Sequence, residues 1–302
     1  MIFRPDTPQA ISLPPIVLLG GKGGVGKTTL SAALGLALAE RGKRVLLVST
    51  DPAHSLADLL EQPLGDAPRR VQGGLFAREI DPEAARAAYL DTVRDNIRRF
   101  AQPEFLQEAE RQVMFAGQHP GVMESALFEA LCRCLDQIGQ WDHIIVDTAP
   151  TGHTLHLLTL PQAMGAWTEA LLARQGEGQG GPEEERWQKA REVLQARRAL
   201  FERTRDRLQN PATTAFLLVA NDDRLSLLEA ERARQTLEQA AVSIPYLLIN
   251  RSQDDADSLR QRLQHHFPGQ TIHPLPNATP PPLGLTSLGD FARQLADVMD
   301  WL

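Results

Sequence analysis

The chain has 302 residues, of which 42% are hydrophobic and 23% are charged, and its formal net charge is −7. This length can bury one large α/β core, and the acidic balance argues against a broad basic surface for nucleic acid. No apolar run is as long as a membrane-spanning helix, the start lacks the layout of a signal peptide, and two cysteines are too few for a disulfide framework. We therefore expect a cytoplasmic protein with no direct membrane insertion and no nucleic-acid partner.

The first predicted elements are a strand over residues 16–20, a glycine-rich loop and a helix that ends near residue 41. The loop reads Gly21-Lys22-Gly23-Gly24-Val25-Gly26-Lys27-Thr28-Thr29. It fits the phosphate-loop pattern, in which glycines let backbone N–H groups wrap an anion at a helix N-terminus. In that pattern Lys27 neutralises the β- and γ-phosphates, and the Thr28 hydroxyl binds Mg²⁺. The loop therefore predicts a site for a nucleoside triphosphate with Mg²⁺.

The middle of the chain alternates apolar strands with charged, helix-period stretches. Predicted in order are a buried strand at 45–50, a weaker strand at 75–80, helical stretches over 82–115, a helix at 121–138 and a strand at 141–147. The two stronger strands end on Asp51 and Asp147, each followed by a polar loop.

The remaining chain continues the alternation. Predicted in order are a helix at 155–173, a flexible glycine-rich linker at 174–181, a charged helix at 182–209, a strand at 215–220, a helix at 225–240, strands at 244–249 and 271–273, a proline-rich loop at 274–282 and a helix at 287–301. This pattern predicts an α/β fold with a doubly wound, mostly parallel sheet. Because no internal repeat is present, we expect residues 1–302 to form a single domain.

Three predicted strand ends, at Gly20, Asp51 and Asp147, should meet at one edge of a parallel sheet, where ligands bind. Asp147 is typical of a Walker-B aspartate, which holds Mg²⁺ directly or through water. Asp51 is placed to orient or deprotonate an attacking water, and we expect it also to hold Mg²⁺ through water. A helix N-cap at Asp147 and a turn-forming Asp-Pro at Asp51 are the structural alternatives.

Three long motifs carry a resemblance to a known family. They are Lys22 to Thr29, Asp51-Pro52-Ala53-His54-Ser55-Leu56 and Asp147-Thr148-Ala149-Pro150-Thr151-Gly152-His153-Thr154. Together they resemble the ArsA-like deviant Walker-A ATPases, which include arsenical pump-driving ATPases and targeting factors for tail-anchored membrane proteins. The resemblance covers nearly the whole chain. It implies ATP hydrolysis on a P-loop NTPase fold of the SIMIBI class, with a helical subdomain for a client or effector formed by residues 83–138 and 161–208.

The resemblance also implies roles for individual residues in a homodimer that closes on ATP. Lys22 would reach the partner's nucleotide and stabilise charge on the transferred phosphoryl group, as an arginine finger does. Asp51, Pro52 and His54 would form the first switch. The second switch would comprise Asp147, Thr148, Gly152 and His153. Asn250 would contact the adenine, and Pro276 would lie beside it.

The client is left open between two classes. An arsenite-transporting pump is the first expectation, with a membrane pump as partner; a chaperone that binds hydrophobic tail-anchored segments is the alternative. No cysteine stands near residues 114–120 or after the second switch, where the arsenite pumps carry ligands. Cys132 and Cys134 are two apart on a predicted helix, where their directions differ by about 200°. They are expected to be buried, and a zinc or metalloid site paired across a dimer is the alternative.

Overall fold

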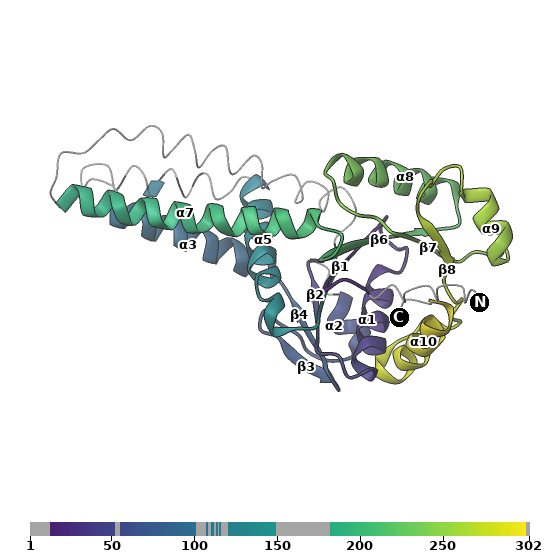
Figure 1. Ribbon diagram of the computed structural model, residues 1–302. Helices are drawn as coiled ribbons and strands as arrows, with labels where there is room; N and C mark the ends of the chain where they lie inside the picture. The colour runs from purple at the N-terminus through teal and green to yellow at the C-terminus, as the bar shows by residue number, and fades with distance from the viewer. Residues whose placement is uncertain are drawn as a thin grey trace, which may run out of the picture.

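Eight strands form one sheet in the computed structural model of the chain (Figure 1). The structure describes residues 13–51, 55–100, 120–148 and 182–299, and separate helical residues between 107 and 115. The strands are β1 (Ile16–Gly20), β2 (Val45–Ser49), β3 (Arg69–Gln72), β4 (Leu75–Glu79), β5 (His143–Asp147), β6 (Thr214–Asn221), β7 (Tyr246–Asn250) and β8 (Thr271–Pro274).

The helices alternate with these strands along the chain. They are α1 (Lys27–Glu40), α2 (Ser55–Leu60), α3 (Pro82–Phe100), α5 (Pro120–Leu135), α7 (Pro182–Gln209), α8 (Arg224–Gln239), α9 (Ala256–Leu263) and α10 (Gly284–Val298), with a short 3₁₀ helix at Ile138–Gln140.

The strand order is β3-β4-β2-β5-β1-β6-β7-β8, and every neighbouring pair is parallel except β3 and β4. Strands β2 to β4 lie on one side of β1 and β6 to β8 on the other, and β5 is inserted between β1 and β2, which is a doubly wound arrangement. The predicted fold class is therefore confirmed. The antiparallel β3 at the edge was not predicted, because its four residues, RRVQ, are mostly exposed and lack an apolar run.

Alternate residues of the central strands face two different hydrophobic cores. Val17 and Leu19 of β1 pack in the core that includes α1, α2 and α10, whereas Ile16 and Leu18 pack in the core that includes α5, α8 and α9. Side chains alternate between the two faces of a strand, so a strand buried on both faces must be apolar throughout. This explains why β1 and β2 read as continuous apolar runs and why helices cover both faces of the sheet.

Helices α3, α5 and α7 pack against one another and extend away from the sheet (Figure 1). Phe128 and Cys132 of α5 form a small core with Phe201 of α7. The ring centroids of Phe128 and Phe201 are 5.4 Å apart. We call α3, α5 and α7 the helical extension.

Several element boundaries differ from the sequence predictions. Helices α2 and α9, of six and eight residues, were not predicted because they are too short for a clear periodic pattern. Helix α10 begins at Gly284, before the predicted start at residue 287, because the Ser287 hydroxyl accepts the N–H of Leu283 and so closes an earlier first turn. The predicted helix at 155–173 and linker at 174–181 lie outside the described residues.

Candidate functional site

The phosphate loop connects the end of β1 to the start of α1, and the neighbouring strands in the sheet are β5 and β6. Gly26 has a φ of 95°, in the left-handed region that favours glycine. At Gly21 the backbone approaches β6 so closely that an added Cβ would lie 2.0 Å from the Val219 carbonyl oxygen. A larger residue therefore does not fit at Gly21 and is strained at Gly26, the two positions where the phosphate-loop pattern requires glycine.

The Lys27 side chain turns back toward the loop. Its Nζ donates hydrogen bonds to the carbonyl oxygens of Gly21, at 3.0 Å, and Lys22, at 3.2 Å. Burial lowers the pKa of Lys27, while the carboxylates of Asp147 and Asp51 act in the opposite direction. A cationic amine held at an anion-binding loop is suited to neutralise phosphate oxygens.

Asp147 is the most deeply buried carboxylate of the site, with 1% of the residue exposed. Burial raises its pKa to about 6, while the nearby Thr28 hydroxyl and Lys27 ammonium lower it. The Thr28 hydroxyl is nevertheless not placed to form a hydrogen bond with Asp147. Neither carboxylate oxygen of Asp147 has a hydrogen-bond partner among the described residues. Burial of a carboxylate without a partner costs free energy, so these oxygens are suited to bind a cation.

Asp51 is linked to Thr28 through the hydroxyl group of Ser55. The Ser55 hydroxyl donates to Oδ2 of Asp51 at 3.2 Å, and Oγ of Ser55 lies 3.4 Å from Oγ1 of Thr28. The Asp51 backbone N–H donates to the Ser49 hydroxyl at 3.2 Å. The fold thus brings Asp51 within reach of the predicted Mg²⁺ ligand Thr28, although most of α1 and all of β2 lie between them in the chain.

The oxygens of Thr28, Asp51 and Asp147 suit Mg²⁺, which prefers hard oxygen ligands. Within the part of the chain that the structure describes, no three His, Cys, Asp or Glu side chains are grouped so that they could hold a metal ion. Mg²⁺ usually takes one or two carboxylates together with waters and substrate phosphates. The donor set therefore fits Mg²⁺ that arrives with a nucleotide.

The second predicted switch begins at Thr148, which is buried. Its hydroxyl donates to the Leu19 carbonyl oxygen at 2.6 Å and so ties the end of β5 to β1. The other predicted switch residues lie outside the described residues: Pro52, His54, Gly152 and His153.

Asn250 and Pro276 lie beside the phosphate loop. The Asn250 amide Nδ2 donates to the Val25 carbonyl oxygen at 2.9 Å. Both residues line a cavity of about 100 Å³ that also includes Gly26 and Phe291. The two predicted base contacts therefore share one cavity beside the phosphate loop, and adenine binding there stays a prediction.

Lys22 is paired within its own chain. Its Nζ lies 3.4 Å from Oε1 of Glu229 on α8, and both side chains are more than one-third exposed. An exposed pair of this kind is weak, typically about 0.2–1 kcal/mol. The lysine is therefore held loosely, and its predicted contact with a partner's nucleotide stays a prediction.

Both cysteines are buried in the structure, as the sequence led us to expect. Burial raises the pKa of Cys132 to about 12 and also raises the pKa of Cys134. Cys132 and Cys134 are 0% and 1% exposed, so in this conformation neither thiol reaches the surface, where a site shared with a second copy of the chain would form.

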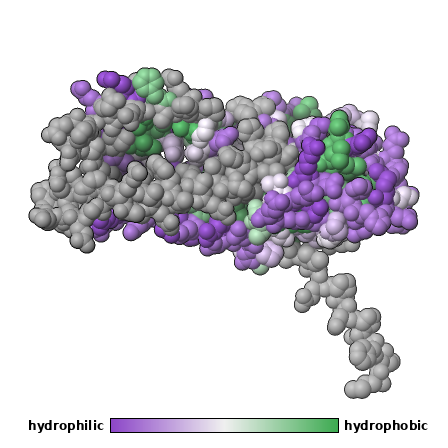
Figure 2. All heavy atoms as spheres, turned by 90° about the horizontal axis from the view of Figure 1, so that it is seen from above, coloured by the Kyte–Doolittle hydropathy of each residue, from purple (hydrophilic) through white to green (hydrophobic). Residues whose placement is uncertain are grey.

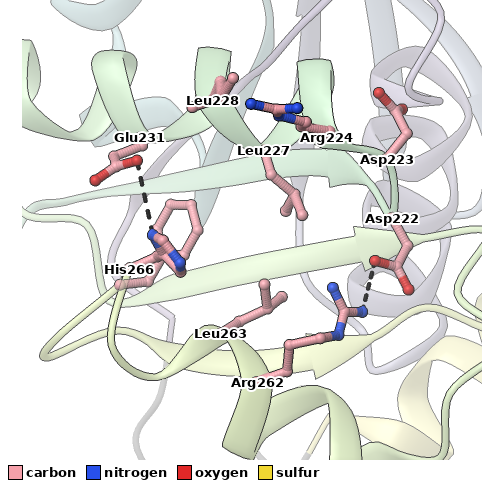
Figure 3. A pocket seen from close by; sticks show the side chains of 10 residues that line it. Asp222, Asp223, Arg224, Leu227, Leu228, Glu231, Arg262, Leu263 and His266 are labelled. Atoms are coloured by element: carbon pink, nitrogen blue, oxygen red, sulfur yellow. Dashed lines mark hydrogen bonds and ion pairs between the residues drawn. The ribbon is translucent and has the colours of Figure 1, made fainter.

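A second hollow lies between α8 and α9 (Figure 3). Its cavity volume is about 480 Å³; Leu227 and Leu263 point into it, and the Arg262–Asp222 and His266–Glu231 pairs flank it. Figure 2 shows hydrophobic side chains among hydrophilic ones over α8. On this helix Leu225 and Leu228 are 64% and 40% exposed.

Sequence reasoning did not identify three residues that contact the site: Ser55, Glu79 and Glu229. Ser55 belongs to the motif that begins at Asp51, so its position in that motif could have indicated a role at the site. Glu79 and Glu229 offered none, because acidic residues at a strand end and on an exposed helix are common. Their partners, α2 and Lys22, are distant in the chain.

The chain is similar in sequence to known proteins. The sequence profile described as "Anion-transporting ATPase" matches residues 15–267. An "Arsenical pump-driving ATPase" of Acidiphilium multivorum is 35% identical over 79% of this chain, and the match spans 40% of that relative. "ATPase ASNA1 homolog 1" of Paramecium tetraurelia is 34% identical over 78% of this chain and 74% of its own length. "Putative arsenical pump-driving ATPase 2" of Aquifex aeolicus is 31% identical over 83% of this chain and 86% of its own length.

The matches to the Acidiphilium and Escherichia coli pump ATPases thus span about 40% of those relatives. Among the described helices, none combines the length and the apolar character needed to cross a bilayer.

Proposed function

Because this chain belongs to the family of anion-transporting ATPases, we propose that it hydrolyses ATP with Mg²⁺ in a nucleotide-gated homodimer. We further propose that this cycle drives arsenite transport, as the names of two of the relatives above indicate for those proteins. The protein would act in the cytoplasm, with a membrane pump as its partner.

The observation that carries the proposal is the link from Asp51 through Ser55 to Thr28. This link lies at the same strand ends as the buried Lys27 and Asp147. A loop that only binds phosphate does not need a carboxylate held beside its Mg²⁺ ligand. A hydrolase does, because water must be oriented and deprotonated as the phosphoryl group leaves.

Each site residue has a separate role in ATP hydrolysis. Mg²⁺, when bound, supplies positive charge to the β- and γ-phosphate oxygens. Lys27 exchanges its two carbonyl partners for phosphate oxygens, and the loop N–H groups donate to the same anion. Thr28 and Asp147 would hold Mg²⁺, and Asp51 would orient the attacking water and take its proton.

Transport by such a protein needs a part that passes the nucleotide state to a partner. We assign this role to a helical subdomain of residues 83–138 and 161–208. Packing of α3, α5 and α7 into an extension that projects from the sheet supports this assignment (Figure 1).

A targeting factor for tail-anchored membrane proteins is the second candidate. It is favoured by the burial of both cysteines, which leaves no exposed thiol for arsenite in the described structure. The two functions differ in what stimulates turnover. Arsenite or antimonite should raise ATPase activity if the chain drives a pump. If neither does, and a transmembrane peptide is retained by the ATP-bound protein, the pump proposal fails.

The hydrolytic site is tested with two substitutions. Lys27→Ala should abolish ATP binding, because the loop loses the buried cation that would neutralise the phosphates. Asp51→Asn should bind ATP normally but hydrolyse it about 10²–10⁴-fold more slowly, the usual contribution of a general base. Equilibrium nucleotide binding and phosphate release measure the two effects. Asp206→Asn, a change of the same kind on the exposed face of α7, is the control. Full activity of Asp51→Asn would remove Asp51 from the mechanism.

A further inference from the structure

Glu79 is a buried carboxylate with two unusual partners. It is the last residue of β4, and 3% of it is exposed. Its Oε1 accepts the backbone N–H groups of Leu56, at 3.1 Å, and Ala57, at 3.0 Å. These N–H groups belong to the first turn of α2, where a helix has no internal partners for them. The burial of the carboxylate is thus compensated by hydrogen bonds to backbone far away in the chain.

This contact closes the loop that carries Asp51. In the β2–β4 ladder Glu79 is paired with Ser49, and the Ile80 N–H donates to the Ser49 carbonyl oxygen at 3.0 Å. The loop therefore leaves the sheet beside Glu79 at Ser49 and returns to Glu79 at Leu56. Its two ends are held at one point, and Asp51 lies between them.

Ser55 transmits this constraint to the site. It directly precedes Leu56, whose N–H is bound by Glu79, and its own hydroxyl donates to Asp51 and lies beside the Thr28 hydroxyl. A shift of the start of α2 would move Ser55 and change the separation between the Asp51 carboxylate and Thr28.

We propose that Glu79 and Ser55 are positioning residues that set the Asp51 carboxylate relative to the Mg²⁺-binding hydroxyl of Thr28. Glu79 acts on the first turn of α2, and Ser55 acts on Asp51 directly. Neither is assigned a bond to the nucleotide. This inference rests on the proposed hydrolytic role of Asp51, and it adds the residues that hold that carboxylate in place.

The test compares Glu79→Ala and Glu79→Gln with Asp81→Ala. Asp81 is a matched control, because its Oδ1 also accepts two first-turn N–H groups, those of Glu83 and Ala84, but in α3. Steady-state ATP hydrolysis is measured at varied ATP and varied Mg²⁺, and ATP binding is measured separately. Glu79→Ala should lower kcat by about ten- to a hundredfold and raise the Mg²⁺ concentration for half-maximal rate, since small misplacements of reacting groups have effects of this size.

Glu79→Gln should recover most of kcat, because its amide oxygen can still accept both N–H groups. Asp81→Ala should lower the Tm but leave kcat and the Mg²⁺ dependence unchanged. If Glu79→Ala and Asp81→Ala lower Tm equally and leave kinetics equally intact, Glu79 is only a structural cap and the inference is wrong.

Ser55→Ala and Ser55→Thr keep the inference testable if Glu79→Ala does not fold. Ser55→Ala should lower kcat with ATP binding unchanged, and Ser55→Thr should restore it because the hydroxyl is retained. Wild-type kinetics in Ser55→Ala would overturn the inference. Asp51→Asn, measured alongside, separates the two levels: a slow Asp51→Asn with normal Glu79 and Ser55 variants leaves the proposed function standing and removes only this inference.

Discussion

Lys27 and Asp147 are oppositely charged residues whose pKa values are both shifted toward the neutral form, chiefly by burial. Each lowers the cost of the other's charge, but the Asp147 oxygens have no hydrogen-bond partner among the described residues. A bound phosphate would supply the missing anionic partner of Lys27, and Mg²⁺ would supply the missing cation beside Asp147. At the scale of single residues, the site is therefore built to be completed by its ligand.

The two cysteines give a prediction about reactivity. Because burial raises the pKa of both thiols, with Cys132 reaching about 12, the native protein should react slowly with a thiol reagent such as DTNB at about pH 8. In denaturant, both thiols of the chain should react at once. A rapid reaction of the native protein would show that the segment around α5 opens, and ATP binding before the assay would then report whether closure protects it.

His143 gives a prediction about pH. It begins β5, and its Nδ1 lies 3.2 Å from the Pro14 carbonyl oxygen. Burial lowers its pKa below the ordinary 6.5, while the Pro14 carbonyl opposes this shift. Since the unfolded chain binds the proton more readily, stability should be lost as the pH falls below 6.5.

The free energy of unfolding in urea, measured from pH 7.5 downward, checks this effect; one group contributes at most about 1.4 kcal/mol per pH unit. His143→Asn retains an N–H donor but does not titrate, so its stability should fall less steeply with decreasing pH. Equal slopes for the two proteins would contradict the assignment.

At the scale of elements, the helical extension depends on packing between α5 and α7. Its small core contains Phe128, Cys132 and Phe201. Beside it, the Arg197 guanidinium lies 2.8 Å from the buried Glu129 and stacks on the rings of Tyr89 and Phe201. This cluster ties all three helices together, because Tyr89 lies on α3 and Glu129 on α5.

Phe201→Ala should therefore destabilise the helical extension. Removal of a buried phenylalanine costs about 3–5 kcal/mol of stability. Phe115→Ala removes the same side chain from a position that is 65% exposed, and it should change stability by less than about 0.5 kcal/mol. Hydrogen exchange of α5 and α7, followed with ATP binding, measures the outcome. Faster exchange with unchanged ATP binding is expected; equal behaviour of the two variants would show that the cluster does not stabilise the extension.

At the scale of the whole molecule, Lys22 forms an ion pair with Glu229 on α8 of the same chain. A weak, exposed pair is easily exchanged for a stronger one with phosphate, since hydrogen bonds between charged groups gain strength when water is excluded. Closure of two copies around ATP would allow this exchange for Lys22.

Lys22→Ala should consequently prevent ATP-dependent dimer formation while it leaves nucleotide binding to one chain nearly intact. Sedimentation velocity with a non-hydrolysable ATP analogue measures this: the wild-type protein should shift from monomer to dimer, and Lys22→Ala should not. Lys43→Ala, which removes an exposed lysine after α1, should behave like the wild type. A dimer of Lys22→Ala as stable as that of the wild type would place Lys22 outside the interface.

The phosphate loop, the strand ends at Asp51 and Asp147 and the α/β alternation were all predictable from the chain itself, because they depend on local patterns. Glycine spacing reflects backbone geometry, continuous apolar runs reflect burial on both faces, and helix periodicity reflects one buried stripe. The roles assigned to the predicted site residues stay predictions, and the structure shows which of those residues lie together.

Only the tertiary structure decided which distant residues meet. The Asn250 amide bonds to Val25 across 225 positions, the Thr148 hydroxyl bonds to Leu19 across 129, and Glu79 holds α2 from another strand. The antiparallel edge strand β3 and the pairing of Lys22 with Glu229 were likewise decided by the tertiary structure. A local pattern states that a side chain is to be buried or polar, but the identity of its partner follows from the strand order and the packing of helices on each face. For this protein, the amino-acid sequence alone determined the phosphate-loop pattern and the strand–helix alternation, and the fold decided which residues lie around that loop.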